Sequence, residues 1–405
     1  MKQKNKKNKW IKFRHRVLRN IIYLLVAPYC RLKYGIKVQR FKQQEKRPYL
    51  ILLNHQTGFD QFFVGMAFKR PIYFLATEDI FSNGFISSLI KYLVAPIPIK
   101  KQTVDVRAVM NCIRVVKEGG TLAIAPEGNR TYSGKTEYMN PAIVSLIRKL
   151  DIPVALFRIE GGYGVQPRWS DVVRKGKMKA YVSKVIYPEE YALLSNEVLV
   201  DMIQQELYVN EAEVSGEFHH KKSAEYLERA MYVCPYCGLS TFESQGMVIA
   251  CKKCGKKIRY LPTKELQGEG FDFPFRFVDD WYEYQKDFIQ RLDNSLYEQQ
   301  PIYEEEVAFS QVIPCQRKDL ICKNAKIQLY GNRIVLESEK QKFCFPFEEV
   351  SAVTVLGKNK LNIYHAGKIY QCKGSKRFNA LKYVHIYYRY KNKDKGEADA
   401  KFLGL

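Results

Sequence analysis

The sequence predicts an α/β domain, built as a mixed sheet flanked by helices, followed by a small four-cysteine segment and a C-terminal β-barrel-like domain capped by a helix. Three observations predict this order. Short apolar runs alternate with helical stretches from Pro48 to Pro188, as in α/β proteins. Two Cys-x-x-Cys pairs follow within residues 231–262. Short alternating runs separated by turn residues then fill residues 305–372, a pattern typical of antiparallel strands.

The chain is long enough for several domains, because it has 405 residues and single cores stop growing at roughly 250–300 residues. Changes in composition place the boundaries. We expect a basic arm that runs into an apolar block (residues 1–45), the α/β domain (46–190) and a helical extension (191–230). The four-cysteine segment (231–262), a helical linker (263–304), the barrel-like domain (305–392) and a polar tail (393–405) follow.

The expected elements follow the apolar runs. In the α/β domain the sequence predicts buried strands at residues 49–53, 72–76, 121–125 and 154–159, a further strand at residues 177–186, and helices at residues 104–117 and 141–150. Residues 189–230 and the linker up to about residue 300 are expected to be largely helical. In the last domain it predicts a closing helix at residues 377–389 and strands at residues 326–330, 333–337, 342–347, 352–356, 360–365 and 368–372. Six or seven strands capped by one helix resemble the pleckstrin-homology or GRAM-type barrel.

The first twenty residues are strongly basic. They hold nine Lys or Arg and no acid, and the whole chain has a net charge of +24, so an anionic partner is expected. The arm runs into an apolar block at residues 21–28, which is far shorter than the ~20 residues that span a bilayer and lacks a cleavage signal. With Trp10 and Phe13 beside it, this block favours an interfacial anchor on anionic lipid over a nucleic-acid-binding tail.

The segment with the clearest chemistry is Asn54-His55-Gln56-Thr57-Gly58-Phe59-Asp60. It lies between an expected strand and a helix expected at residues 57–68, and such corners are where α/β folds place ligand sites. Asp60 can accept a hydrogen bond from one imidazole nitrogen of His55 and leave the other nitrogen as a general base. The alternative is a helix capping box from Thr57 to Asp60, with His55 as a loop residue that has no chemical role.

A second segment, Pro126-Glu127-Gly128-Asn129-Arg130-Thr131, ends the strand expected at residues 121–125. Gly128 allows the backbone to approach a ligand closely, and Arg130 can hold a phosphate with two hydrogen bonds. An ordinary surface turn with a solvated Arg is the alternative. Between the two segments, Lys100 and Lys101 follow the rigid apolar run at residues 95–99 and add two cations.

The order and spacing of these pieces resemble the glycerophospholipid acyltransferase family, which includes the lysophosphatidic acid acyltransferases. Residues 54–60 match the family's N-H-x-x-x-x-D block, and residues 126–131 match P-E-G-T-R-S/T with Asn129 in place of the first Thr. A third family block, which usually ends in Arg, ends here in Lys100. Residues 152–156 match a fourth block, the family's V-P-V strand. The resemblance covers about residues 45–190, which is under half of the chain.

The resemblance implies a role for each site residue. His55 would be the general base on the acceptor hydroxyl, and Asp60 would orient it. The phosphate of the acceptor would be bound by a set of residues around it: Glu127, Gly128, Arg130, Lys100 and Lys101. The acyl donor would be a thioester of acyl carrier protein or of coenzyme A, with no catalytic cofactor.

Residues 160–170 depart from a plain acyltransferase. Their glycines suggest a loop that lines the site, with Arg168 as a further contact for an anion. A tight connection packed around Trp169 fits the same residues equally well.

Cysteines form a metal-site pattern in the middle of the chain. Cys234, Cys237, Cys251 and Cys254 give C-x2-C-x13-C-x2-C, with a glycine after each pair that allows a tight knuckle. Four thiolates make a closed tetrahedral site, so one structural Zn2+ in a zinc ribbon is expected. A redox dithiol pair or an iron–sulfur cluster is the alternative. The remaining six cysteines are scattered, and this pattern without a signal peptide indicates a reduced, cytosolic protein.

The resemblance implies an acyltransferase that moves a fatty acyl group from acyl-ACP or acyl-CoA to 1-acyl-glycerol-3-phosphate, giving phosphatidic acid. The expected partners are an anionic membrane surface, the lysophospholipid acceptor and the thioester donor, and nucleic acid is disfavoured. The expected location is the cytoplasmic face of the cell membrane, as a peripheral or monotopic protein. The alternatives are a different lysophospholipid or glycolipid acceptor, or a catalytically silent lipid- or nucleic-acid-binding adaptor.

Overall fold

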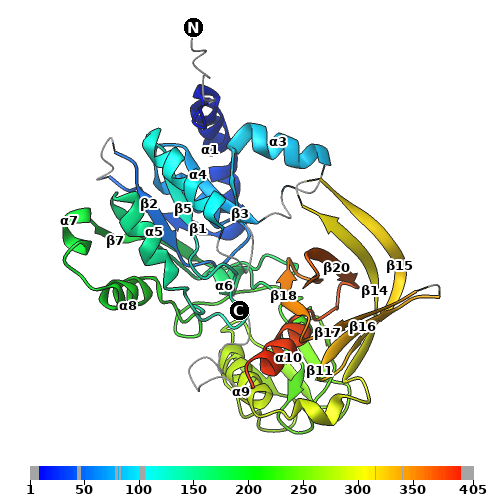
Figure 1. Cartoon of the computed structure of the whole chain (residues 1–405). Helices are drawn as coiled ribbons and strands as arrows, with labels where there is room; N and C mark the ends of the chain where they lie inside the picture. Colours follow the sequence, from blue (N-terminus) through cyan, green and yellow to red (C-terminus); the bar gives the residue numbers. More distant parts are fainter. Residues whose placement is uncertain are drawn as a thin grey trace. The chain divides into compact units, whose positions relative to one another are not determined.

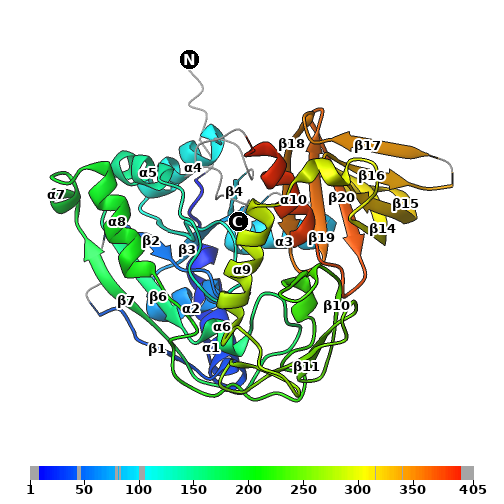
Figure 2. The same ribbon diagram turned by 90° about the horizontal axis from the view of Figure 1, so that it is seen from below.

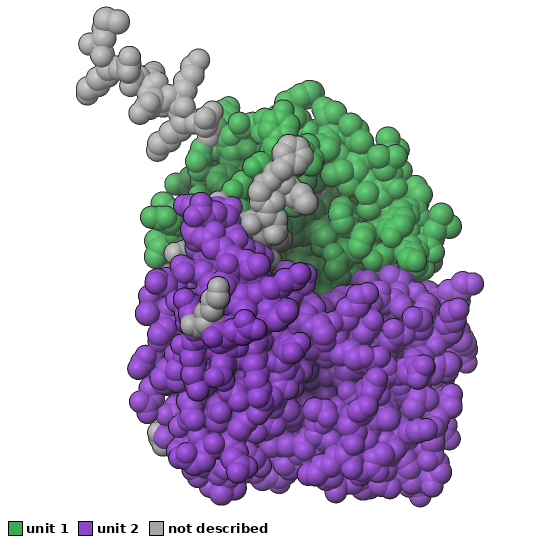
Figure 3. Space-filling view, turned by 90° about the vertical axis from the view of Figure 1, so that its right-hand side faces the viewer, with its two compact units in different colours: residues 1–130, 136–162, 177–210 green, residues 131–135, 163–176, 211–405 purple. Residues whose placement is uncertain are grey.

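Figure 1 shows the computed structural model of the chain, which describes residues 9–42, 47–77, 81, 84–99, 105–314, 316–339 and 341–393. The chain divides into two compact units, coloured separately in Figure 3. Unit 1 comprises Met1–Arg130, Thr136–Gly162 and Lys177–Asn210, and unit 2 comprises Thr131–Lys135, Tyr163–Gly176 and Glu211–Leu405. Two short segments from inside the expected α/β domain are therefore part of unit 2.

Unit 1 is built on a seven-stranded sheet with the order β1-β7-β6-β2-β5-β3-β4. Its strands are Ile36–Val38 (β1), Leu50–Leu53 (β2), Ile72–Thr77 (β3), Ile97–Ile99 (β4), Thr121–Ile124 (β5), Val154–Glu160 (β6) and Met178–Ile186 (β7). β6 and β7 run antiparallel, whereas the other paired strands are parallel. The prediction of an α/β domain with a mixed sheet is confirmed.

Helices lie on the faces of this sheet (Figure 1). They are Phe13–Tyr34 (α1), Asp60–Ala67 (α2), Gly84–Val94 (α3), Val106–Lys117 (α4), Ala142–Leu150 (α5), Pro188–Tyr191 (α7) and Asn196–Leu207 (α8), and the short α6 (Gly162–Val165) follows β6. The helices expected at residues 104–117 and 141–150 are α4 and α5. The sequence pattern did not assign α1 or α3 as helices, and α2 begins at Asp60 rather than at residue 57.

The central strand β2 is buried on both faces of the sheet. All four of its residues are buried, as expected for a parallel strand covered on both sides. Leu50 and Leu52 belong to one apolar cluster with residues of α4, α5 and α8, and the strand alternation turns Ile51 and Leu53 to the opposite face. The segment after Leu53 is thus fixed at the middle of the sheet.

Unit 2 begins with two small sheets that carry the cysteines. One pairs Val233–Cys234 (β8) with Gly238–Leu239 (β9), and the other is an antiparallel sheet in chain order. The strands of the second are Phe242–Gln245 (β10), Val248–Cys251 (β11), Lys257–Tyr260 (β12) and Leu266–Gly268 (β13). This sheet extends past residue 262, the expected end of the four-cysteine segment.

The C-terminal part of unit 2 is a seven-stranded antiparallel sheet with the order β17-β16-β15-β14-β20-β19-β18. Its strands are Tyr303–Ile313 (β14), Arg317–Leu329 (β15), Arg333–Glu337 (β16), Lys342–Pro346 (β17), Val350–Leu356 (β18), Lys360–His365 (β19) and Lys368–Gly374 (β20). The sheet is curled, and Leu381–Lys391 (α10) packs beside it (Figure 2). This arrangement fits the predicted barrel-like domain, whereas the resemblance to a pleckstrin-homology or GRAM-type barrel stays a prediction.

Two expectations about the connecting segments are wrong. Residues 208–226 contain no helix, and only a 3-10 turn, Leu227–Arg229 (η2), follows them. Their backbone instead bonds to distant segments, for example Phe218 to Pro262 and His219 to Lys175. The linker expected at residues 263–304 is helical only at Val278–Gln290 (α9) and Asn294–Tyr297 (η3), and it contains β13 and the start of β14.

Candidate active site

The site is built where β2 ends. Asn54 follows Leu53, and its side chain both donates to the carbonyl of Ile159 and accepts from the N–H of Ile159, each at 2.8 Å. These two bonds fix the chain leaving β2 against β6. Sequence reasoning gave Asn54 no role of its own, although its place in the N-H-x-x-x-x-D block marked the position.

His55 and Asp60 are brought together. Nδ1 of His55 lies 2.7 Å from Oδ2 of Asp60. The His55 side chain is 29% exposed and that of Asp60 only 2%, so the carboxylate sits behind the ring and the ring can be reached from solvent. A carboxylate at Nδ1 favours the tautomer with the proton on Nδ1, which makes Nε2 a proton acceptor.

Asp60 also orders the loop that carries the histidine. Its carboxylate accepts hydrogen bonds from the backbone N–H groups of Gln56 (2.8 Å) and Thr57 (3.0 Å) and from the Thr57 hydroxyl (2.7 Å). The alternative of a Thr57–Asp60 capping box is not formed, because Phe59 is the N-cap and has no side-chain cap. The Thr57 hydroxyl donates to Asp60 and accepts from the N–H of Phe59.

Glu127 ties this loop to the end of β5. Its Oε1 accepts from the N–H of His55 and its Oε2 from the N–H of Glu137, both at 3.0 Å. Both oxygens are therefore engaged by the backbone, a role that the sequence did not indicate. Burial raises the pKa of Glu127 from 4.5 to about 8, although the two backbone N–H donors act in the opposite direction.

Replacing Glu127 with Gln should change how stability depends on pH. A carboxyl whose folded pKa is raised from 4.5 to about 8 contributes stability that is fully present below about pH 4.5 and is lost as the pH rises through 8. Gln does not titrate, so the stability advantage of the wild type over Glu127→Gln should shrink between pH 5 and pH 8.5. Urea unfolding at several pH values checks this, and an advantage that grows with pH would contradict it.

Of the other four phosphate-binding candidates, the structure describes Gly128 and Arg130. Gly128 has a φ of 70°, a left-handed conformation that favours glycine, and its N–H donates to the carbonyl of Ala125 to close the turn. A Cβ built on Gly58 would lie 4.0 Å from Nη1 of Arg130, so the Arg130 guanidinium lies beside the loop of His55. Lys100 and Lys101 lie outside the described residues.

A cavity of about 510 Å3 opens beside Glu127 within unit 1. Its walls come from the turn after β5, from residues 136–139 and from the end of α8, and they include Tyr138, Met139, Leu207 and Tyr208. Among the described residues that line it, none is Lys or Arg. The cavity therefore suits an uncharged part of a substrate better than a phosphate.

Residues 163–170 are packed inside unit 2. Trp169 is fully buried, and Arg168, which is 4% exposed, lies 4.2 Å from the ring centroid of Tyr132. The structure thus shows the packed connection around Trp169, the second of the two interpretations of this segment.

The four cysteines form one cluster. Their sulfur atoms all lie within 4.8 Å of one another, so they could hold a metal ion. Cys234 and Cys254 have their sulfurs 3.8 Å apart and Cys237 and Cys251 3.6 Å apart, close to the edge of about 3.8 Å that a tetrahedral site with metal–sulfur bonds of about 2.3 Å requires. Gly238 and Gly255, with φ of 71° and 74°, supply the expected knuckles.

The environment of Cys251 favours a thiolate ligand. Burial raises the pKa of this thiol, but hydrogen bonds from the Ser240 hydroxyl and from the backbone N–H groups of Cys254 and Lys253 outweigh burial and lower the pKa to about 7. Thiolate is the form in which cysteine binds metal. Cys234 and Cys251 are buried, Cys237 is half-buried and Cys254 is exposed.

Helices that could span a membrane are absent from the part of the chain that the structure describes. The longest, α1, exposes a row of apolar residues on one face: Phe13, Val17, Ile21, Leu24, Leu25 and Leu32. Its buried residues, His15, Ala27, Cys30 and Tyr34, are on the opposite face of the helix.

The part of the chain that contains this site is similar to known proteins. Residues 35–159 match the family model described as Acyltransferase, a range that contains both His55 and Arg130. The chain is 23% identical over 179 residues to 1-acyl-sn-glycerol-3-phosphate acyltransferase of Bacillus subtilis (strain 168), covering 43% of this chain and 85% of that protein.

Among solved structures, the chain is similar to the 1-acyl-sn-glycerophosphate (LPA) acyltransferase PlsC from Thermotoga maritima. The TM-score is 0.37 and the identity 19%, over 49% of this chain and 92% of that one. The family match and the relative from Bacillus subtilis support the resemblance that the sequence motifs indicated. The match with the acyltransferase family model covers residues 35–159, which is less than half of the chain.

Proposed function

We propose that this chain moves a fatty acyl group from a thioester, acyl-ACP or acyl-CoA, to the free hydroxyl of 1-acyl-glycerol-3-phosphate and so produces phosphatidic acid. The observation that carries the proposal is the His55–Asp60 pair, with Nδ1 of His55 2.7 Å from the buried carboxylate. The pair lies in a loop that is bonded to Glu127 and is flanked by Arg130. The similarity to 1-acyl-sn-glycerol-3-phosphate acyltransferase supports the choice of acceptor.

The reaction follows from these groups. Nε2 of His55 takes the proton of the acceptor hydroxyl as its oxygen attacks the thioester carbonyl carbon. The tetrahedral intermediate collapses when the carbon–sulfur bond breaks, and the leaving thiolate receives the proton from the imidazolium. The products are a new ester and one free thiol. Asp60 stabilises the imidazolium while it is present.

The substrate is held by residues with separate roles. Arg130 binds the acceptor phosphate, for which its planar guanidinium is suited. Glu127 acts as a positioning residue rather than as a phosphate contact, because both of its oxygens already accept from backbone N–H groups. The cavity beside Glu127, which lacks cations among its lining residues, takes an uncharged part of the substrate.

The test is the release of free thiol by the purified protein from acyl-CoA and acyl-ACP against a panel of acceptors. The panel contains lysophosphatidic acid, a second lysophospholipid and a glycolipid. We expect release that depends on lysophosphatidic acid and matches the phosphatidic acid formed. Faster release with another acceptor would reassign the substrate, and no release with any pair would favour a silent lipid- or nucleic-acid-binding adaptor.

We also propose that the four cysteines hold one structural Zn2+. The sulfur–sulfur distances of 3.6 and 3.8 Å fit a tetrahedral metal with four thiolates. The Cys234→Ser variant should lose its zinc, whereas Cys344→Ser, which changes an exposed cysteine outside the cluster, should keep one zinc per chain. Elemental analysis of both proteins decides this, and a folded wild type with iron or with no metal would contradict the assignment.

Finally, we propose that α1 lies on the cytoplasmic surface of an anionic membrane. Leu24 and Leu25 are each 70% exposed, and the same segment is rich in Lys and Arg, a combination typical of interfacial helices. Leu24→Glu should weaken co-sedimentation with phosphatidylglycerol vesicles several-fold. Leu193→Glu changes a still more exposed leucine of unit 1 outside α1 and should leave the co-sedimentation unchanged. Equal binding by both variants would exclude α1 as the anchor.

A further inference from the structure

Two short segments of the acyltransferase region are built into the metal-binding unit. Residues Thr131–Lys135 and Tyr163–Gly176 belong to unit 2, although the residues on either side of each belong to unit 1. Thr131 directly follows Arg130, and Tyr163 directly follows Gly162. The two segments, which we call the inserted segments, therefore continue from the two stretches of chain that border the candidate active site.

The second of these junctions is packed tightly against the catalytic loop. A Cβ built on Gly162 would lie 2.6 Å from Cβ of Gln56 and 3.3 Å from Cγ2 of Thr57. Such close approach requires glycine at this position. Because Gln56 and Thr57 are the residues whose N–H groups bind Asp60, the position of Gly162 bears directly on the loop that carries His55.

The inserted segments are bonded to each other and buried in the same core as the cysteines. The hydroxyl of Tyr163 donates to the carbonyl of Tyr132 at 3.1 Å, and Nε1 of Trp169 donates to the hydroxyl of Tyr163 at 3.0 Å. All three aromatic residues belong to one continuous apolar cluster with Cys234 and Cys251. The core of unit 2 thus contains both the inserted segments and two of the four metal ligands.

Arg174 links the second inserted segment to the cysteine-bearing sheet. It is 1% exposed, and it donates to the Tyr260 hydroxyl at 3.0 Å and to the Ser223 carbonyl at 2.5 Å. The rings of Trp169 and Tyr260 also pack edge to face, with centroids 5.8 Å apart. Tyr260 ends β12, which pairs with β11, the strand that ends at Cys251.

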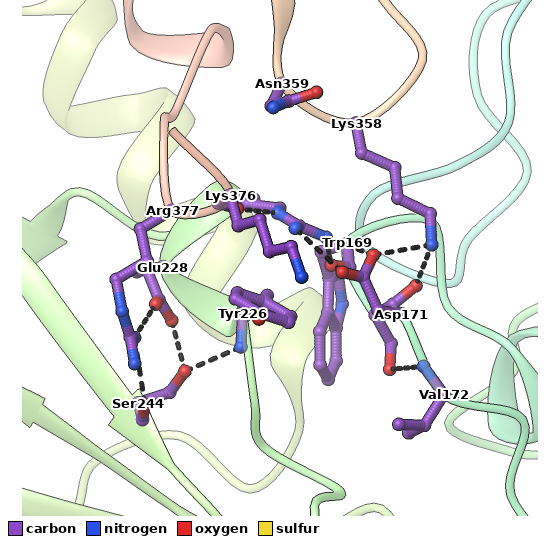
Figure 4. A network of polar contacts seen from close by, with 12 residues as sticks. Trp169, Asp171, Val172, Tyr226, Glu228, Ser244, Lys358, Asn359, Lys376 and Arg377 are labelled. Carbon is purple, nitrogen blue, oxygen red and sulfur yellow. Dashed lines mark hydrogen bonds and ion pairs between the residues drawn. The ribbon is translucent and has the colours of Figure 1, made fainter. Parts of the chain in front are cut away.

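A second link joins the second inserted segment, Tyr163–Gly176, to η2 and to the barrel-like domain (Figure 4). The buried Arg229 donates to the Trp169 carbonyl at 2.7 Å and to Asp171 at 2.8 Å. Lys358, in the turn between β18 and β19, donates to the Ser170 carbonyl and to Asp171. Burial alone would raise the pKa of Asp171, but Arg229 and Lys358 lower it to about 2, so the carboxylate stays charged.

We propose that metal loading of the four cysteines regulates the acyltransferase site by fixing the two inserted segments, and with them Arg130 and Gly162. The two sheets that carry the cysteines are small, with strands of four residues or fewer, so their order depends on the metal. Loss of the metal loosens β11 and β12, and Tyr260 then no longer holds Arg174 and Trp169. This regulation rests on the proposed function.

The first experiment compares the zinc-loaded full-length protein with Cys254→Ser and with wild type stripped by a chelator. Hydrogen exchange is measured peptide by peptide. We expect peptides that cover residues 131–135 and 163–176 to exchange at least about tenfold faster without metal, while peptides from β2, β5 and β6 keep their protection. Zinc added back to the stripped wild type should restore the protection.

Kinetics provide the second readout. The KM for the acceptor should rise about tenfold without metal, within the usual range of coupling between sites, because Arg130 and Gly162 lose their positions. The kcat should change less than about threefold, because the loop of His55 is also held by its own hydrogen bonds to Asp60 and Glu127. A merely structural role of the metal would instead lower kcat and the protection of both units together.

A matched pair of variants tests the link without touching the cysteines. Tyr260→Phe removes the hydroxyl that Arg174 bonds, and Tyr390→Phe removes an exposed hydroxyl that bonds Glu348. Tyr260→Phe should keep one zinc, expose residues 163–176 to exchange and raise the KM, whereas Tyr390→Phe should match the wild type.

Two outcomes overturn the proposal: unchanged exchange of both inserted segments in metal-free protein, or unchanged exchange and KM in Tyr260→Phe. If the zinc-loaded protein transfers no acyl group, the proposed function fails, and the exchange data still decide whether the metal fixes the segments. If Cys254→Ser does not fold, the stripped wild type and Tyr260→Phe decide the question.

Discussion

Replacing His55 with Ala should lower the rate of thiol release about a thousandfold. A positioned general base contributes typically about 10²–10⁴ to a rate, and His55 is the imidazole whose Nδ1 is held by the buried Asp60 at 2.7 Å. Without it, the acceptor hydroxyl must attack without losing its proton to the enzyme. The loss should appear in kcat and KM should change little, because the variant keeps Arg130, which we propose binds the phosphate.

The chain offers a matched control for this variant. His219 forms a 2.8 Å pair with Glu217 on the surface of unit 2, so His219→Ala removes a histidine–carboxylate pair of similar geometry outside the site. Its rate should equal that of the wild type. A His55→Ala protein that keeps more than about a tenth of the wild-type rate would show that another group is the base.

Replacing Asp60 with Asn should lower the rate about a hundredfold or more and should also reduce stability. The carboxylate sets the tautomer of His55 and accepts hydrogen bonds from Gln56 and Thr57. An amide in its place turns an N–H group toward these donors, and leaving buried donors unmatched costs about 1–3 kcal/mol. The kcat and the free energy of unfolding in urea should therefore fall together.

The control for Asp60→Asn is Asp319→Asn, which changes an exposed aspartate paired with Arg317 at 2.8 Å. Exposed ion pairs contribute little, about 0–1 kcal/mol, so this variant should match the wild type in rate and nearly in stability. If Asp60→Asn lost stability but kept its rate, Asp60 would be a loop-ordering residue and not the orienter of a base.

The sequence predicted best what is local. The strands β2, β5 and β6 were predicted because parallel strands in the middle of a sheet are continuous apolar runs. β14 was not among the predicted strands, and three consecutive acids, Glu304–Glu306, stand at its start. In the structure Glu304 pairs with Lys326 of β15 and Glu305 pairs with Lys382 of α10, two residues that only the folded domain brings near.

In the candidate site, too, the local contact could be predicted from the sequence and the contacts between distant segments could not. The spacing of His55 and Asp60 was enough to predict their contact, because the two residues are five positions apart at one corner. The part that Glu127 plays was not predictable, since its partners are backbone N–H groups of His55 and Glu137, which carry no sequence signal. The inserted segments were also missed, because their assignment to unit 2 depends on packing with residues up to 188 positions away.

The most direct test of the central claim is the stoichiometry of one reaction. Purified protein is given an acyl thioester and 1-acyl-glycerol-3-phosphate, and free thiol and phosphatidic acid are measured together. Equal amounts of both products, formed only when the lysophospholipid is present and about a thousandfold more slowly with His55→Ala, are the expected result. Thiol released without the acceptor, or phosphatidic acid formed as fast by His55→Ala as by the wild type, would contradict it.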